Sequence, residues 1–153
     1  MKKRVLENPR DILDIIENCQ VCYVSMVDAD NKPYVIPMNF GFADNTILLH
    51  GAKHGKKIDI LKNNPNVCIV FSIDHQLRWQ HEEVACSWSM KYRSVLAYGK
   101  VEFIDSNAEK EAVFHQFMKN YTEKDFKYSK PSLEEVQVLK VPVDQFEGRV
   151  YGY

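Results

Sequence analysis

Short apolar segments separated by polar turns recur along this chain, and their alternation and β-branched content are typical of strands. Segments of this kind cover residues 21–27, 33–42, 46–49, 67–73, 94–104 and 136–143, with a further extended piece at 84–88. Because parallel strands need a crossover helix and none lies between the first three segments, we predict antiparallel pairing. Pro37 cannot donate to a ladder, so we expect an edge, a bulge or a break there.

Helical periodicity is confined to three stretches. Residues 11–19 repeat apolar side chains at helical spacing directly after Asn8 and Pro9, which can start a helix. A short helix is predicted at 58–64, where Pro65 stops it. The third follows Ser106, a capping residue, and runs to about residue 121. Its buried side is predicted to carry Ala112, Val113, Phe114, Phe117 and Met118. The polar residues 74–83 are expected to form a loop, and residues 146–151 a short tail.

About six strands in hairpin-like succession, with few and peripheral helices, favour a mainly β fold over a doubly wound parallel sheet. We therefore predict an antiparallel six-stranded β-barrel with peripheral α-helices. The sequence contains no repeat and no linker, so residues 1–153 are expected to form a single domain.

The composition narrows the classes of function. A net charge of −1 and a pI near 6.5 give no general attraction to nucleic acid or anionic lipid. No apolar run reaches membrane-spanning length, and no apolar stretch follows the basic start of the chain as in a signal peptide. We therefore expect a cytoplasmic protein that binds neither nucleic acid nor membrane.

The four cysteines include a C-x-x-C pair, Cys19 and Cys22, so a metal or redox role has to be considered. A zinc site would need a second pair, and Cys68 and Cys86 are far apart. Buried structural thiols are the preferred interpretation, and no metal site is expected.

The segment from residue 48 to 57 concentrates the positive charge of the chain. It holds two glycines, three lysines and two histidines between a strand and a helix, and no acidic residue lies between Asp44 and Asp59. Lysines at a helix N-terminus are unfavourable because backbone N–H groups already make that end positive. Lys56 and Lys57 make sense there if an anion binds, and phosphate is the usual ligand.

Three interpretations of this segment compete. A nucleoside triphosphate loop would need four residues between its glycines and a hydroxyl after the lysine, but Gly51 and Gly55 are separated by three and Lys57 takes the hydroxyl position. A solvated turn with lysines in water is the simplest alternative. The third is a mononucleotide phosphate held by Lys56, Lys57 and backbone N–H groups, with the glycines allowing close approach.

Four motifs in order support the third interpretation. They are Pro33 to Gly41, then Leu49-His50-Gly51-Ala52 with Gly55-Lys56-Lys57, then Asn64-Pro65, and finally Tyr92-Arg93-Ser94-Val95 with Tyr98-Gly99. From about residue 5 to 149 the chain resembles the FMN-binding split barrels related to pyridoxamine 5′-phosphate oxidase. The His50-Gly51-Ala52 and Tyr92-x-Ser94-Val95 elements are similar to the nitroimidazole-resistance branch of that family.

The resemblance implies a split β-barrel homodimer with FMN at the subunit interface. It assigns the ring-side backbone to Val35, Ile36, Pro37, Met38 and Asn39, the phosphate to Lys56 and Lys57, a phosphate or ribityl contact to Ser94, and the ribityl and ring side to His50, Gly51 and Ala52. The activity it implies is that of an FMN-dependent oxidoreductase that reduces nitro groups of small aromatic compounds. The alternatives are a flavin-binding protein without turnover, a haem-handling split barrel, and a role without flavin.

His50 is the catalytic candidate because the resemblance places it near the flavin and an imidazole can donate a proton near neutral pH. The alternative is that His50 only hydrogen-bonds the cofactor or the loop. In the tail, Arg149 is followed two residues later by Tyr151, where the vitamin oxidases carry Arg-x-His. Pyridoxamine phosphate oxidation is therefore not expected.

Three further groups of residues could carry chemistry. His75, His81 and Cys86 fit no familiar zinc spacing and are interpreted as exposed loop residues. Trp79, Trp88 and Tyr92 could stack on a flavin or a flat substrate, with core or dimer packing as the preferred alternative. His115 is expected to be a surface or packing residue.

Overall fold

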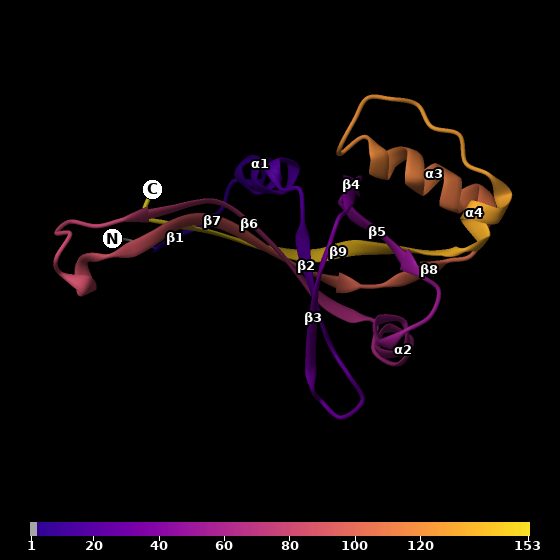
Figure 1. Cartoon of the computed structure of the whole chain (residues 1–153), viewed down its shortest axis with the longest axis horizontal. Coiled ribbons are helices and arrows are strands. Elements are labelled where there is room, and N and C mark those ends of the chain that lie inside the picture. The colour runs from indigo at the N-terminus through magenta and orange to yellow at the C-terminus, as the bar shows by residue number, and fades with distance from the viewer. Residues whose placement is uncertain (1–2) are drawn as a thin grey trace.

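The computed structural model describes residues 3–153 and has one mainly antiparallel sheet with peripheral helices (Figure 1). The strands are β1 (Lys3–Leu6), β2 (Cys22–Val27), β3 (Pro33–Met38), β4 (Gly41–Ala43), β5 (Thr46–Ala52), β6 (Asn66–Arg78), β7 (Ser89–Lys100), β8 (Glu102–Ile104) and β9 (Val136–Tyr151). The helices are α1 (Pro9–Asn18), α2 (Lys56–Asn63), α3 (Asn107–Met118) and α4 (Lys130–Glu134), with a 3-10 turn η1 (Ala85–Ser87).

The strands follow the order β3-β2-β6-β7-β9-β5-β4, and β1 and β8 also pair with β9. The fold class expected from the sequence is confirmed, but residues 3–153 contain nine strands rather than six, in a sheet that is not closed. The core lies between the curved inner face of the sheet and the apolar side of α1, where Ile15 and Ile16 are fully buried with Phe40, Phe71 and Leu139.

A long arm made by β6 and β7 extends away from the rest of the sheet, and both ends of the described chain lie near it (Figure 1). The expected loop at 74–83 is wrong for residues 74–78, which belong to β6. Residues 85–87 form a 3-10 turn rather than extended chain. Residues 74–77 of β6 are exposed on both faces of the strand, so this end of β6 carries no apolar alternation. A bulge near Asp74, whose φ is 57°, also interrupts the register.

Two other expectations are revised at this level. Residues 146–151 continue β9 as one strand instead of forming a separate tail. On α3, Ala112 is exposed, whereas Lys110 is buried and donates to the carbonyls of Leu133 and Val136 at 3.0 and 2.8 Å. Lysine counts as a polar position in the hydrophobic pattern, so Lys110 was left out of the predicted buried side of the helix and the exposed Ala112 was included.

Pro37 pairs with Tyr23, and it is tolerated because β3 is the edge strand of the sheet. A break in the ladder starts two residues after Pro37, at positions 39–40, where the chain leaves β3 and starts β4. Residues 50–52, expected in a turn, belong to β5, and α2 begins at Lys56 rather than at residue 58.

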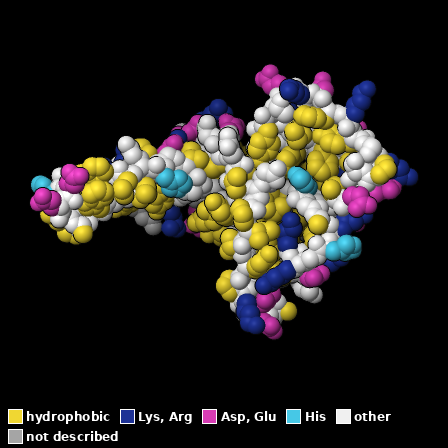
Figure 2. Space-filling model, viewed as in Figure 1, with side chains coloured by type: hydrophobic (Ala, Val, Ile, Leu, Met, Phe, Trp, Pro, Cys, Tyr) yellow, Lys and Arg dark blue, Asp and Glu magenta, His cyan; other side chains and the backbone are white. Residues whose placement is uncertain are grey.

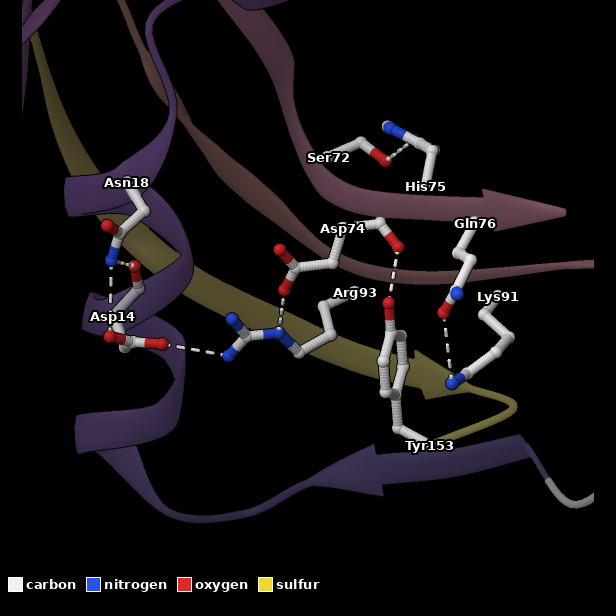
Figure 3. A network of polar contacts seen from close by, with 9 residues as sticks. All are labelled: Asp14, Asn18, Ser72, Asp74, His75, Gln76, Lys91, Arg93 and Tyr153. Atoms are coloured by element: carbon white, nitrogen blue, oxygen red, sulfur yellow. Dashed lines mark hydrogen bonds and ion pairs between the residues drawn. The ribbon is translucent and has the colours of Figure 1, made fainter.

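A polar network joins the base of the arm to α1 and to the end of the chain (Figure 3). Arg93 on β7 donates to the carboxylates of Asp14 on α1 and Asp74 on β6, the former at 2.8 Å. The Tyr153 hydroxyl donates to the Asp74 carbonyl at 2.6 Å. This network fixes α1 against the sheet. Each helix within residues 3–153 is too short or too polar to cross a membrane.

Candidate functional site

The end of β3, the end of β5 and the start of α2 meet at Lys57. Its Nζ lies 3.9 Å from the sulfur of Met38 on β3. At Gly51 on β5, a side-chain Cβ would come within 2.4 Å of the same Nζ. The absence of a side chain at Gly51 therefore makes room for the ammonium group. Desolvation in this half-buried position lowers the pKa of Lys57 below its ordinary value.

The first turn of α2 adds a second cation. Gly55 precedes the helix with a φ of 115°, in the region that favours glycine. Lys56 follows and lies over the ring of Tyr34 on β3, 4.6 Å from its centroid. Neither Lys56 nor Lys57 has a carboxylate partner among residues 3–153. Figure 2 shows Lys and Arg side chains gathered where β3 and α2 approach each other.

The start of a helix, two ammonium groups without a carboxylate partner in the described chain and a glycine-lined approach have the charge and the donors that suit a small dianion. The donor set fits a phosphate monoester, which needs several N–H donors and positive charge without competing carboxylates.

His50 lies on β5 beside this cluster and packs against α3. Its ring centroid is 4.8 Å from that of Phe117 and 5.2 Å from that of Phe114. Burial, together with the nearby positive charge of Lys57, lowers the pKa of His50 below 6.5. The imidazole is thus mainly neutral at pH 7 while no anion is bound beside Lys57.

The segment assigned to the ring side, Val35 to Asn39, reaches this region at Met38, whose sulfur contacts Lys57. Met38 is buried and Ile36 is half-buried, whereas Val35, Pro37 and Asn39 are exposed. Asn39 occupies the break between β3 and β4, where backbone groups leave the ladder.

Ser94 is not brought to the Lys57 cluster within one chain. It lies on β7, paired with Ser72 on β6 and Arg149 on β9, and β7 is three strands from β3 in the sheet order. The next residue, Val95, is fully buried in the core, so Ser94 points to the opposite face of the sheet. Ala52 is exposed at the end of β5.

The remaining sequence candidates lie elsewhere. His75 is hydrogen-bonded to Ser72 at 2.8 Å, and within residues 3–153 no group of three His, Cys, Asp or Glu side chains could hold a metal ion. The rings of Trp79 and Trp88 stack on each other at 4.4 Å on the arm. His115 is exposed and lies 3.8 Å from Glu111.

The cysteines have different environments. Cys19 and Cys22 are buried free thiols, as expected, and burial raises the pKa of Cys22 to about 12. Neither is therefore a thiolate at neutral pH. Cys68 is half-buried, and Cys86 is exposed on the arm, so the expectation of buried thiols is wrong for Cys86.

Two aromatic residues near the site were not predicted. Tyr34 is half-buried and lies on the same face of β3 as Ile36 and Met38. That alternation marks it as an inward-facing ring, which could have been noticed as a partner for a lysine. Tyr121 follows α3 and hydrogen-bonds Phe40, 81 positions away in the chain. No local pattern indicates a contact of that separation.

Comparison with known proteins gives a consistent result. The sequence profile of the family described as pyridoxamine 5′-phosphate oxidase matches residues 8–150. A candidate 5-nitroimidazole antibiotic resistance protein from Bacteroides thetaiotaomicron is 44% identical, with a TM-score of 0.88, covering 97% of this chain and 87% of its own. Among curated proteins none matches.

Two more distant structures share the fold. The flavocytochrome Anf3 from Azotobacter vinelandii is 18% identical with a TM-score of 0.83, covering 97% of this chain and 70% of its own. A FAD and haem binding protein from Mycobacterium smegmatis is 16% identical with a TM-score of 0.82, covering 100% and 75%. The family resemblance predicted from the four motifs is confirmed.

Proposed function

This chain belongs to the pyridoxamine 5′-phosphate oxidase family, and on that premise we propose that it is an FMN-dependent oxidoreductase that reduces nitro groups of small aromatic compounds. The observation that carries the cofactor assignment is the pair of lysines at the start of α2 without a carboxylate partner among the described residues, with Lys57 half-buried against Gly51 and Met38. The similarity to a candidate nitroimidazole resistance protein supports the substrate class.

Lys56, Lys57 and the first N–H groups of α2 would hold the FMN phosphate. The backbone of Val35 to Asn39 would lie beside the ring system, and His50, Gly51 and Ala52 would line the ribityl and ring side. Bound FMN supplies two-electron redox chemistry between a reduced donor and an acceptor such as a nitro group. The protein's part is to bind the cofactor, orient it and limit access to it.

His50 is the residue of this chain best placed to interact with the reacting end. Because its pKa is lowered, it is a neutral hydrogen-bonding group in the free protein, and a phosphate dianion next to Lys57 would raise that pKa. We therefore assign His50 to orienting the ring or substrate, with proton donation following only once the anion is bound.

The sheet supplies a surface for a second copy of the chain. On the face opposite the core, Tyr23, Val70 and Leu96 lie in one register across β2, β6 and β7, and all three retain solvent exposure. Ser94 is on this face. A homodimer built on it would bring Ser94 of one chain toward the cofactor site of the other.

The phosphate assignment is tested with Lys56→Ala combined with Lys57→Ala. We expect this double variant to lose FMN affinity by about a hundredfold or more, because two charge-assisted contacts are removed. Its affinity for riboflavin, which lacks the phosphate, should change little. Lys62→Ala, on the last turn of the same helix, is the matched control. Full flavin loading of the double variant would refute the assignment.

The activity is tested by anaerobic reduction of a 5-nitroimidazole with a reduced nicotinamide as donor, followed by absorbance. Turnover that depends on added FMN supports the oxidoreductase assignment. Stoichiometric FMN binding without turnover of any nitroaromatic would instead indicate a flavin-binding protein.

A further inference from the structure

Tyr121, just beyond α3, connects three segments that are distant in sequence. Its hydroxyl accepts a hydrogen bond from the Phe40 N–H at 2.8 Å and donates one to the Gln20 carbonyl at 3.0 Å. Its own N–H donates to the Met118 carbonyl at 3.0 Å, which holds the residue in the turn that ends α3. The hydroxyl therefore joins the end of α3, the link between α1 and β2, and the break between β3 and β4.

The break between β3 and β4 needs such a partner. Phe40 lies outside both strands, is fully buried and packs on Phe71 with ring centroids 4.8 Å apart. An unpaired buried N–H costs about 1–3 kcal/mol. The Tyr121 hydroxyl supplies the acceptor, so it fixes the direction in which the chain leaves Met38 and Asn39.

The same residue is linked to the other side of the candidate site through rings. The Tyr121 centroid lies 5.7 Å from that of Phe117, which in turn lies 4.8 Å from that of His50. Phe40 therefore connects Tyr121 to the end of β3, and Phe117 connects it to His50. The two hydrogen bonds of the Tyr121 hydroxyl go to Phe40 and Gln20, and not to Lys57, Gly51 or His50.

We infer that Tyr121 is a positioning residue for the flavin site: its hydroxyl, bonded to Phe40 and Gln20, sets the backbone of residues 38–39 against the ring system of the cofactor. This inference rests on the proposed FMN site. It assigns the contribution of Tyr121 to the contact between the backbone of residues 38–39 and the ring system, and not to the phosphate contact of Lys56 and Lys57.

The chain contains a matched control in Tyr128. Its ring also packs near α3, stacked on Phe114 at 5.3 Å. Its hydroxyl, however, is buried without a hydrogen-bond partner in the part of the chain that the structure describes. Tyr128→Phe and Tyr121→Phe remove the same atom, but only the second removes two hydrogen bonds.

The test measures the dissociation constants of FMN and riboflavin, and the absorption spectrum of the bound flavin, for the full-length wild type and both variants. Tyr121→Phe should raise both constants by about five- to tenfold, equivalent to roughly 1–1.4 kcal/mol, and shift the near-ultraviolet flavin band. Equal factors for the two ligands locate the effect at the ring, because riboflavin has no phosphate. Tyr128→Phe should change neither constant by more than about twofold.

The outcomes separate the inference from the proposed function. If the wild type binds FMN and Tyr121→Phe matches it in both constants and in spectrum, the inference is wrong and the proposed site stands. A wild type that binds neither flavin overturns both. If Tyr121→Phe does not fold, amide exchange of Phe40 in the wild type decides: slower exchange with FMN is expected, and unchanged exchange contradicts the inference.

Discussion

At the scale of single residues, the environment of the Lys57 ammonium group is defined by a missing side chain and a missing counter-charge. Gly51 leaves the space that the Nζ occupies, and the lysine has no carboxylate partner within residues 3–153. An ammonium group half-removed from water without a counter-charge is unfavourable by itself. Anion binding would remove that cost, which is why we assign this group to the phosphate.

Gly51→Ala tests this directly. The new Cβ would meet only the end of a flexible side chain, so the lysine moves aside and the free energy of unfolding should fall by less than about 1 kcal/mol. The displaced ammonium should raise the FMN dissociation constant by about tenfold. Isothermal titration with FMN and thermal unfolding of the free protein measure the two effects. Unchanged FMN affinity would show that Lys57 does not contact the phosphate.

His50 gives a pH-dependent prediction. Its pKa in the folded protein is below the ordinary value of 6.5, so the folded state binds fewer protons than the unfolded state as pH falls. The contribution of neutral His50 to stability is present above about pH 6.5 and is lost progressively below it. Urea unfolding from about pH 7.5 to about pH 5.5 should therefore show a steeper loss in the wild type than in His50→Gln. Parallel pH profiles would contradict the lowered pKa.

At the scale of elements, α3 is placed by a close approach to β4. A Cβ at Gly41 would lie 2.6 Å from the Cα of Phe117, a backbone atom that cannot rotate away. This contact holds Phe117 against His50 and sets the distance between helix and sheet.

Gly41→Ala should cost about 1–3 kcal/mol of unfolding free energy, because the helix has to shift. Gly51→Ala is the natural comparison, since it is the same substitution against a flexible partner. We expect thermal unfolding of Gly41→Ala to move several times further than that of Gly51→Ala. Equal shifts would mean that α3 adjusts freely.

The hydrophobic pattern of the sequence predicted some of these elements correctly and missed parts of others. Alternating apolar positions predicted β2, β3 and most of β5 because one side of each faces the core. They missed residues 74–78 of β6 and residues 89–93 of β7, which lie on the arm. None of these residues is fully buried, so only the pairing between the two strands defines them. The buried Lys110 misled the helix pattern in the same way, since its carbonyl partners on α4 and β9 are invisible in the local sequence.

In the candidate site too, local features were predictable from the sequence and tertiary contacts were not. Lys56 and Lys57 were predicted from charge at a helix start, which is a local property. The contact of Lys57 with Met38, the packing of His50 on α3 and the hydrogen bonds of Tyr121 join segments 19 to 101 residues apart and depend on the tertiary arrangement.

At the scale of the whole molecule, the sheet face opposite the core is the surface on which we place the proposed homodimer. Apolar side chains in register on β2, β6 and β7 lie there with Ser94, which is separated from Lys57 within one chain. Leu96→Glu should convert the proposed homodimer to a monomer by placing a charge in the buried interface. Gln116→Glu, exposed on α3, is the control. Light scattering after size-exclusion chromatography measures the molecular mass of each variant. If the Leu96→Glu variant is still a dimer, the interface lies elsewhere.

Binding of FMN is the property on which both the proposed function and the role of Tyr121 depend. The most direct measurement is the absorption spectrum of the protein after incubation with FMN and removal of excess, with the released chromophore identified and counted. We expect one FMN per chain and a flavin spectrum. A protein that stays colourless, or one that takes up haem and shows a Soret band instead, would contradict it.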